Sequence, residues 1–115
     1  MRPTVVLMLL KKPFDTPEQT ANTLKKLALA ARKDGFNKYE TRALVNRDNN
    51  IDRIWSELLG MFEHCHSNNI HHIYFNNILY VKELVEKIRE SSEMIKTYEL
   101  VLHFLIADKV YNLND

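Results

Sequence analysis

The side chains best suited to chemistry near the start of the chain follow a run of six apolar residues, 5–10. They are Lys11, Lys12, Asp15, Thr16 and Gln19. In an open α/β sheet, the turn that leaves a strand and opens a helix commonly carries ligand-binding or catalytic groups. No glycine stands in this turn. A phosphate-binding loop or a dinucleotide-binding fingerprint, which needs glycine for close backbone approach, is therefore excluded there.

A second group of chemistry-bearing side chains lies within ten residues. It consists of Glu63, His64, Cys65, His66, His71 and His72. A metal site is one hypothesis, but residues two apart on a helix point to different sides, and adjacent strand residues point to opposite faces. The spacing matches no standard zinc motif. The alternative is that the first two histidines favour a helix C-terminus, and that Cys65 is a half-buried hydrophobic residue. We expect no metal and no cofactor.

The hydrophobic pattern predicts strands that alternate with helices. Thr16, Pro17 and Gln19 form a capping box that opens the first helix, and Gly35 ends it. The predicted strands are residues 5–10, 39–45, 70–75 and 100–106, and the helices between them are residues 17–34, 51–67 and 79–96. Trp55 is the predicted core anchor of the second helix, and the tail from Asp108 is expected to be short. The fold class is a single three-layer α/β domain, 1–115, with a mostly parallel four- to five-stranded sheet covered by helices on both faces, flavodoxin-like in layout.

Composition limits the class of protein. The 115 residues suit one domain with a real core, and 16 basic against 15 acidic side chains give a net charge of +1. This is not the strongly basic balance of a dedicated nucleic-acid binder, so any DNA contact must be a local patch. The single cysteine excludes an internal disulfide, and the first apolar run is too short to span a bilayer. No signal-peptide cleavage site follows that run, and we expect a cytoplasmic protein without membrane contact.

Five cations would converge at the C-terminal edge of the predicted sheet. They are Lys11, Lys12, Arg47, Arg53 and Lys82. Two interpretations are open: these side chains form a nucleic-acid-binding or anion-binding site, or they form a solvated polar rim.

Residues 13–19, PFDTPEQ, resemble the R-V-S-T-x-E-Q motif in the N-terminal catalytic domain of the serine recombinases, the resolvase and invertase family. Thr16, Glu18 and Gln19 match the motif. Pro13 stands where that family has an arginine, and Asp15 stands where it has the serine nucleophile. Thr16 is the nearest hydroxyl, and its role as a helix cap already explains it.

The resemblance continues along the chain. The segment 53–59, RIWSELL, is similar to the family's R-P-x-L-x-x-L segment, so that Arg53 matches an active-site arginine. The segment 73–83, IYFNNILYVKE, lies without a gap over a strand followed by S-R-L-x-R, and Tyr80 and Glu83 fall where the two arginines belong. The segment 100–113, LVLHFLIADKVYNL, resembles the closing strand and the loop after it.

The resemblance implies a resolvase-like fold without the chemistry, because the serine and most of the arginines are absent. It implies an accessory or regulatory role in DNA recombination, with DNA or a recombination-related protein as partner, and homodimerisation by analogy. The family's dimerisation helix and helix-turn-helix DNA-binding domain have no counterpart in these residues. The alternative function is a domain that binds a small ligand or phosphate at the basic edge.

Overall fold

The computed structural model describes residues 4–45, 50–76, 81–106 and 109–112, and Arg47 and Tyr80 lie outside these ranges. Its elements are β1 (Thr4–Lys11), α1 (Pro17–Lys33), β2 (Lys38–Val45), α2 (Ile51–Ser67), β3 (His72–Phe75), α3 (Lys82–Glu90), α4 (Ser92–Thr97), β4 (Val101–Ile106) and β5 (Lys109–Asn112). The predicted alternation of strands and helices is confirmed. Among the described residues, no helix is both long and apolar enough to cross a membrane.

The strands form one sheet in the order β2-β1-β3-β4-β5. The first four are parallel, and β5 runs antiparallel to β4. The predicted mostly parallel sheet is therefore confirmed, although the tail after Asp108, expected only to be short, contains the strand β5. From β1 the chain moves outward to β2, whereas from β3 it moves the other way to β4. This reversal places a topological switch point between β1 and β3.

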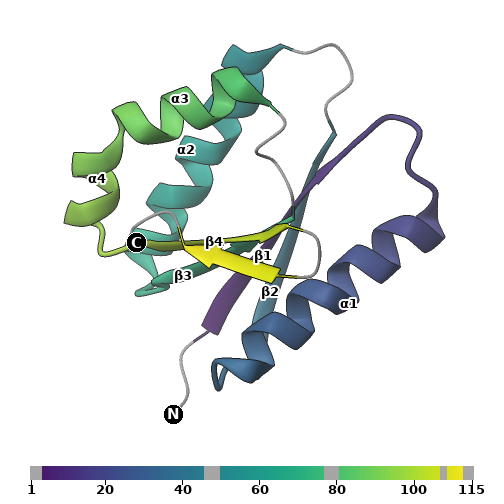
Figure 1. Ribbon diagram of the computed structural model, residues 1–115. Helices are drawn as coiled ribbons and strands as arrows, with labels where there is room; N and C mark the ends of the chain where they lie inside the picture. Colours follow the sequence, from purple (N-terminus) through teal and green to yellow (C-terminus); the bar gives the residue numbers. More distant parts are fainter. Residues whose placement is uncertain (1–3, 46–49, 77–80, 107–108, 113–115) are drawn as a thin grey trace.

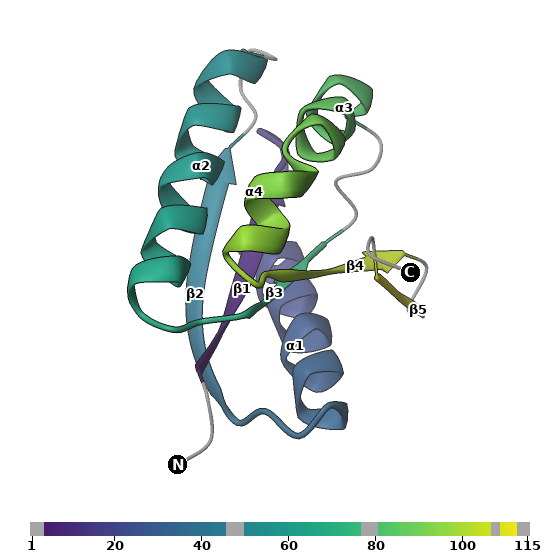
Figure 2. The ribbon, with the colours of Figure 1, turned by 90° about the vertical axis from the view of Figure 1, so that its left-hand side faces the viewer.

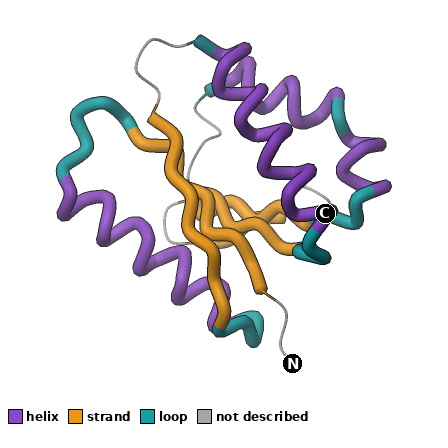
Figure 3. Tube along the Cα trace, turned by 180° about the vertical axis from the view of Figure 1, so that it is seen from behind, coloured by secondary structure: helices purple, strands orange, loops and turns teal. Residues whose placement is uncertain are grey.

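The sheet is the middle one of three layers. Helix α1 covers one face, and α2, α3 and α4 cover the other (Figures 1 and 2). The same sandwich is seen from behind in Figure 3. Along β1, Val6 and Met8 pack in the core on the α2 side, whereas Val5 and Leu7 pack in the core on the α1 side. Burial on both faces explains why β1 is a continuous apolar run rather than an alternating one.

The start of α1 is fixed locally, as predicted. The Thr16 hydroxyl oxygen accepts a hydrogen bond from the backbone N–H of Gln19 at 3.1 Å, and the Gln19 side-chain oxygen accepts one from the backbone N–H of Thr16 at 2.8 Å. The capping box is complete. After α1, Gly35 adopts a φ of 92°, a left-handed conformation that side chains rarely adopt.

The core anchor of α2 is not the predicted residue. Ile54 and Phe62 are completely buried, whereas Trp55 is only half-buried and packs against the edge of that core. The Trp55 and Phe62 rings meet edge to face with their centroids 6.2 Å apart. The predicted helical spacing of the buried residues is right, but the aromatic residue at the centre of the buried stripe is Phe62 rather than Trp55.

Two predicted boundaries are also wrong. The helix expected over 79–96 is two helices, α3 and α4, separated at Ser91. The Ser91 N–H bonds the carbonyls of Lys87 and Ile88, and serine favours such end positions over helix interiors. The third strand begins at His72 rather than at Ile70, whose N–H donates to the Cys65 carbonyl at 2.9 Å and closes the turn that follows α2.

Candidate functional site

The switch point places the turn after β1 beside the end of β3. Asn76, directly after β3, binds both backbone groups of Leu10 in β1. Its side-chain oxygen accepts from the Leu10 N–H at 2.9 Å, and its side-chain nitrogen donates to the Leu10 carbonyl at 2.9 Å. Met8 and Phe75 are the last directly paired residues of the two strands, so the Asn76 amide continues the ladder beyond them. Asn76 falls between the predicted strand 70–75 and the predicted helix 79–96, and no role was predicted for it.

The turn from Lys12 to Asp15 is closed twice. The Asp15 N–H donates to the Lys12 carbonyl at 3.1 Å, and the Lys12 N–H donates to the Asp15 carboxylate at 2.9 Å. Pro13 occupies the second position of this turn, where its fixed φ is favoured. Phe14 occupies the third position and is 93% exposed. The carboxylate that stands in place of the resembled family's serine therefore holds the turn together.

The resembled active-site positions that the structure describes have local structural roles or lie on the surface. Gln19 completes the α1 cap, Pro13 is exposed in the turn, and Glu83 is exposed in the first turn of α3. Tyr80 is outside the described residues. The Thr16 hydroxyl, the nearest alternative nucleophile, accepts the Gln19 N–H. These contacts serve folding of the turn and helix.

The predicted cations that the structure describes share one edge of the sheet but have different surroundings. Lys11 is half-buried at the end of β1, and Lys12 is exposed in the turn. Lys82 is exposed at the start of α3. Arg47 lies outside the described residues. The structure therefore brings Lys11 and Lys12 to the switch point itself and places Lys82 at the same edge, where the chain enters α3.

Arg53 is held at the end of β2. Its guanidinium donates to the Val45 carbonyl at 3.0 Å and to the Glu57 carboxylate at 3.4 Å. A guanidinium bound to a terminal strand carbonyl stabilises the junction between β2 and α2. We therefore place Arg53 at the margin of the candidate site.

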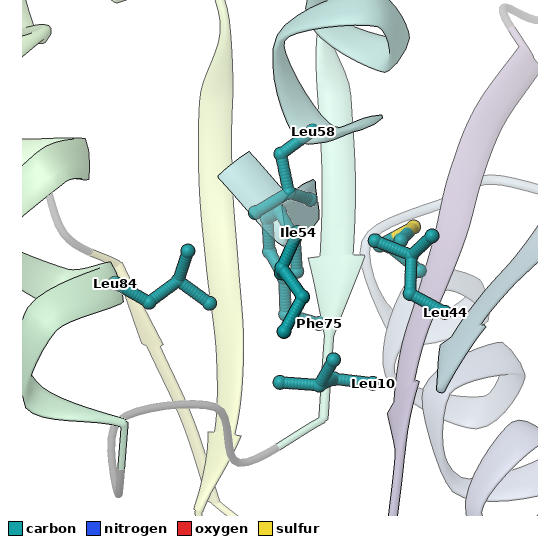
Figure 4. A pocket seen from close by; sticks show the side chains of 7 residues that line it. Leu10, Leu44, Ile54, Leu58, Phe75 and Leu84 are labelled. Atoms are coloured by element: carbon teal, nitrogen blue, oxygen red, sulfur yellow. The ribbon is translucent and has the colours of Figure 1, made fainter. Parts of the chain in front are cut away.

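A small apolar cavity lies between the sheet and the α2–α3 layer (Figure 4). It is lined by Met8, Leu10, Leu44, Ile54, Leu58, Phe75 and Leu84. Its volume of about 10 Å³ is close to that of one water-sized probe, and no polar group lines it. This cavity is therefore too small to hold a ligand larger than about one water molecule.

The histidines of the second group have separate partners. His64 lies 2.8 Å from a Glu40 carboxylate oxygen, and His66 stacks on Tyr98 with ring centroids 4.1 Å apart. His72 instead contacts His103 of β4. Within the described ranges, no three His, Cys, Asp or Glu side chains form a group that could hold a metal ion.

Cys65 is completely buried rather than half-buried. Burial raises the pKa of its thiol to about 11, with a smaller contribution from the Glu40 charge. A thiol with this pKa is almost entirely protonated at neutral pH and is a poor nucleophile. Its contribution is to packing under α2.

A polar cluster that the sequence did not predict lies on the α1 side of β3 and β4. The Tyr74 hydroxyl donates to the Asp34 carboxylate, and the Tyr74 ring stacks on His103 with centroids 4.3 Å apart. The His72 Nδ1 lies 3.0 Å from the His103 Nε2. Burial lowers the pKa of His72, although the Asp34 charge opposes this shift. The cluster could not be predicted from the sequence, because it depends on the pairing of Tyr74 in β3 with His103 in β4.

Comparison with known proteins adds no family: no family model, no curated protein and no solved structure matches this chain.

Proposed function

We propose that this chain is a non-catalytic, resolvase-like domain that binds DNA phosphates at the carboxyl edge of β1 and β3, in an accessory role in DNA recombination. The observation that carries the proposal is the strand order, which puts Lys11 and Lys12 at the topological switch point. Ligands of doubly wound sheets bind at this position. The role in recombination rests on the resemblance of residues 13–19 and 53–59 to the serine recombinases.

Three lysines and one helix N-terminus supply positive charge at this edge. Lys11 and Lys12 leave β1 directly before α1, and Lys82 begins α3. The N-terminal end of the 17-residue helix α1 adds the positive end of its dipole next to the two lysines. Asp15, Glu18 and Glu83 carry negative charge at the same edge, so we propose that phosphates are contacted by individual lysines and by the N-terminal end of α1 rather than by a broad basic patch.

The absence of catalysis is supported by how the turn uses its polar groups. Phosphoryl transfer to a side chain needs a hydroxyl nucleophile and cations around the transferring phosphate. Asp15, in place of the serine, accepts the Lys12 N–H, and Thr16 caps α1. Both side chains stabilise the shape of the turn, which suits binding.

Fluorescence anisotropy with labelled single- and double-stranded DNA at low and moderate salt tests the proposal. We expect saturable binding that weakens with salt, with a slope that reports the number of neutralised phosphates. The double variant K11A/K12A should bind more weakly. A matched control, K33A/K96A, removes two exposed lysines from the helix ends that lead into the opposite edge of the sheet, and it should bind like the unchanged chain.

Either of two results would overturn the proposal. One is the absence of saturable binding to both DNA forms at low salt. The other is an equal loss of affinity in K11A/K12A and K33A/K96A, because the affinity would then follow net charge rather than this edge.

A second candidate is a small phosphate-bearing ligand at the same edge. It is favoured by the confinement of Lys11, Lys12 and Lys82 to the switch-point edge, which is compact compared with a groove that follows a DNA duplex. A thermal-shift screen with nucleotides distinguishes this candidate, because a ligand of the folded state raises the melting temperature. We expect K11A/K12A to abolish any such shift if this candidate is right.

A further inference from the structure

The outer side of β2 is an open sheet edge. In the described sheet, β2 is the terminal strand and pairs only with β1, over all eight of its residues. Thr41, Arg42 and Ala43 are exposed at its centre. A regular edge strand of this length presents backbone groups that can pair with another strand.

A groove lies beside this edge, between β2 and α2. Its volume is about 450 Å³, and it is lined by Met8, Arg42, Ala43, Leu44, Glu57, Gly60 and Met61. Gly60 on α2 has no side chain, and a Cβ added there would meet nothing within 4 Å. A second strand can therefore approach β2 without displacing a large side chain of α2.

The charges along β2 alternate on the side that faces α2. Leu44 packs with the α2 core, so Arg42 and Glu40, two and four residues earlier, share its face. The contact between Glu40 and His64 of α2 agrees with this assignment. The open edge therefore presents an acid and a base, two residues apart, on one face.

We propose that β2 is a self-association surface: it pairs antiparallel with β2 of a second copy of this chain, with Thr41 on the two-fold axis. In this register, Glu40 lies opposite the position of Arg42 in the second copy, and Arg42 lies opposite Glu40. The two-fold symmetry creates two equal ion pairs across the interface. The two sheets become one continuous sheet, and both α2 helices lie on the same side of it.

Neighbouring registers are disfavoured by the same charges. A shift that centres the pairing on Glu40 sets the two glutamates opposite each other and sets Lys38 opposite Arg42. A shift that centres it on Arg42 sets the two arginines opposite each other. Like charges directly opposite each other destabilise a strand pair, so the charge pattern selects the register centred on Thr41.

Sedimentation of the full chain over a wide concentration range, with charge-reversal variants, tests this proposal. The unchanged chain should pass from one to two copies as concentration rises. In R42E the edge carries two acids, and in E40R it carries two bases. We expect either variant alone to have a dissociation constant raised by about tenfold or more, because two attractive pairs become repulsive.

An equimolar mixture of R42E and E40R provides the rescue, because each acid then lies opposite a base. The mixture should form a dimer that contains one copy of each variant. R89E, a charge reversal at an exposed position of α3, is the matched control and should dimerise like the unchanged chain. Circular dichroism on every variant confirms folding, which matters for E40R because Glu40 contacts His64.

Three results would overturn the proposal: an unchanged chain that stays monomeric at all concentrations, an R42E variant that dimerises as well as the unchanged chain, or a mixture that stays monomeric while both variants are folded. If the unchanged chain stays monomeric, the open edge of β2 would instead be a surface for a strand of a different protein. DNA binding measured on the same samples is a separate readout, so the two proposals can fail independently.

Discussion

Asn76 joins two segments that are 66 residues apart with a single side chain. Both of its amide atoms bind the backbone of Leu10, in a partly buried setting at the end of β1. A side-chain amide can replace a strand residue in this way because it carries a donor and an acceptor with peptide-like geometry. The candidate site depends on this contact, since it holds the ends of β1 and β3 together.

We predict that Asn76→Ala lowers the free energy of unfolding by about 1–3 kcal/mol, because the N–H and carbonyl of Leu10 lose their partners in a partly buried position. Urea denaturation followed by circular dichroism measures the change. Asn37→Ala, at an exposed position, is the control and should lie close to the unchanged chain. Equal denaturation midpoints for the two variants would show that the Asn76 amide does not stabilise the contact between the ends of β1 and β3.

His72 makes stability depend on pH. Burial lowers its pKa below the ordinary value of 6.5, against a raising effect of Asp34 and with a further lowering by His71. The Nε2 of His103 lies 3.0 Å from the Nδ1 of His72. The His72 side chain therefore takes up a proton more readily in the unfolded chain than in the folded chain, so its contribution makes stability fall as the pH drops from about 6.5 through its lowered folded-state pKa.

We predict a melting temperature that decreases between about pH 7.5 and about pH 5.5, with a smaller decrease in His72→Gln. Scanning calorimetry at both pH values measures this. His66→Gln, which removes an exposed histidine, is the matched control for the loss of one imidazole. The assignment to His72 is wrong if His72→Gln and the unchanged chain have the same pH slope.

At the scale of elements, α2 shows that helical periodicity defines the buried stripe better than it defines the central residue of that stripe. The buried residues Ile54, Leu58, Met61, Phe62 and Cys65 follow helical spacing. Trp55 lies at the border of this stripe, where part of its ring remains in solvent. We therefore expect Phe62, whose ring meets the Trp55 ring edge to face, to contribute more to stability than Trp55.

We predict that Phe62→Ala lowers the free energy of unfolding by about 3–5 kcal/mol, as is typical of a fully buried aromatic side chain. Trp55→Ala should cost less, because its ring is partly solvated in the folded state. Denaturant midpoints of the two variants give the order. A larger loss of unfolding free energy in Trp55→Ala than in Phe62→Ala would show that Trp55 is the main core residue of α2.

At the scale of the whole molecule, the charged residues of the two proposed surfaces lie at different edges of the doubly wound sheet. The carboxyl edge carries Lys11 and Lys12 at the switch point, and the open β2 side carries the alternating charges Glu40 and Arg42. The proposed DNA contact and the proposed self-association therefore use different surfaces. A dimer through β2 would leave both switch points available, and it would double the number of phosphate contacts.

We predict that incubation with DNA gives no covalent adduct, because Asp15 stands in place of a serine nucleophile and its carboxylate binds the Lys12 N–H. Denaturing electrophoresis of labelled DNA after incubation checks this outcome. Asp15→Ser should also give no adduct, since the phosphate-stabilising cations of the resembled family are not restored. A protein-linked DNA band from the unchanged chain would contradict the non-catalytic proposal.

The sequence alone determined the features that depend on neighbouring residues. The capping box of Thr16 and Gln19, the turn at Gly35, the apolar strand β1 and the buried stripe of α2 each follow from residues within a few positions. From these, the alternation of strands and helices and the mostly parallel, three-layer class could be predicted. So could the position of Lys11 and Lys12 at a carboxyl edge.

The tertiary structure alone decided the features that join distant segments. Three contacts depend on strand order, register or side-chain direction: the hydrogen bonds of Asn76 with Leu10, the stacking of Tyr74 on His103, and the hydrogen bond of Arg53 to the Val45 carbonyl. So do the open β2 edge and the groove beside it. Periodicity states which face of an element is buried, but it carries no information on which other element covers that face. For this reason the sequence could place chemistry at an edge, whereas the partners of each side chain had to come from the folded molecule.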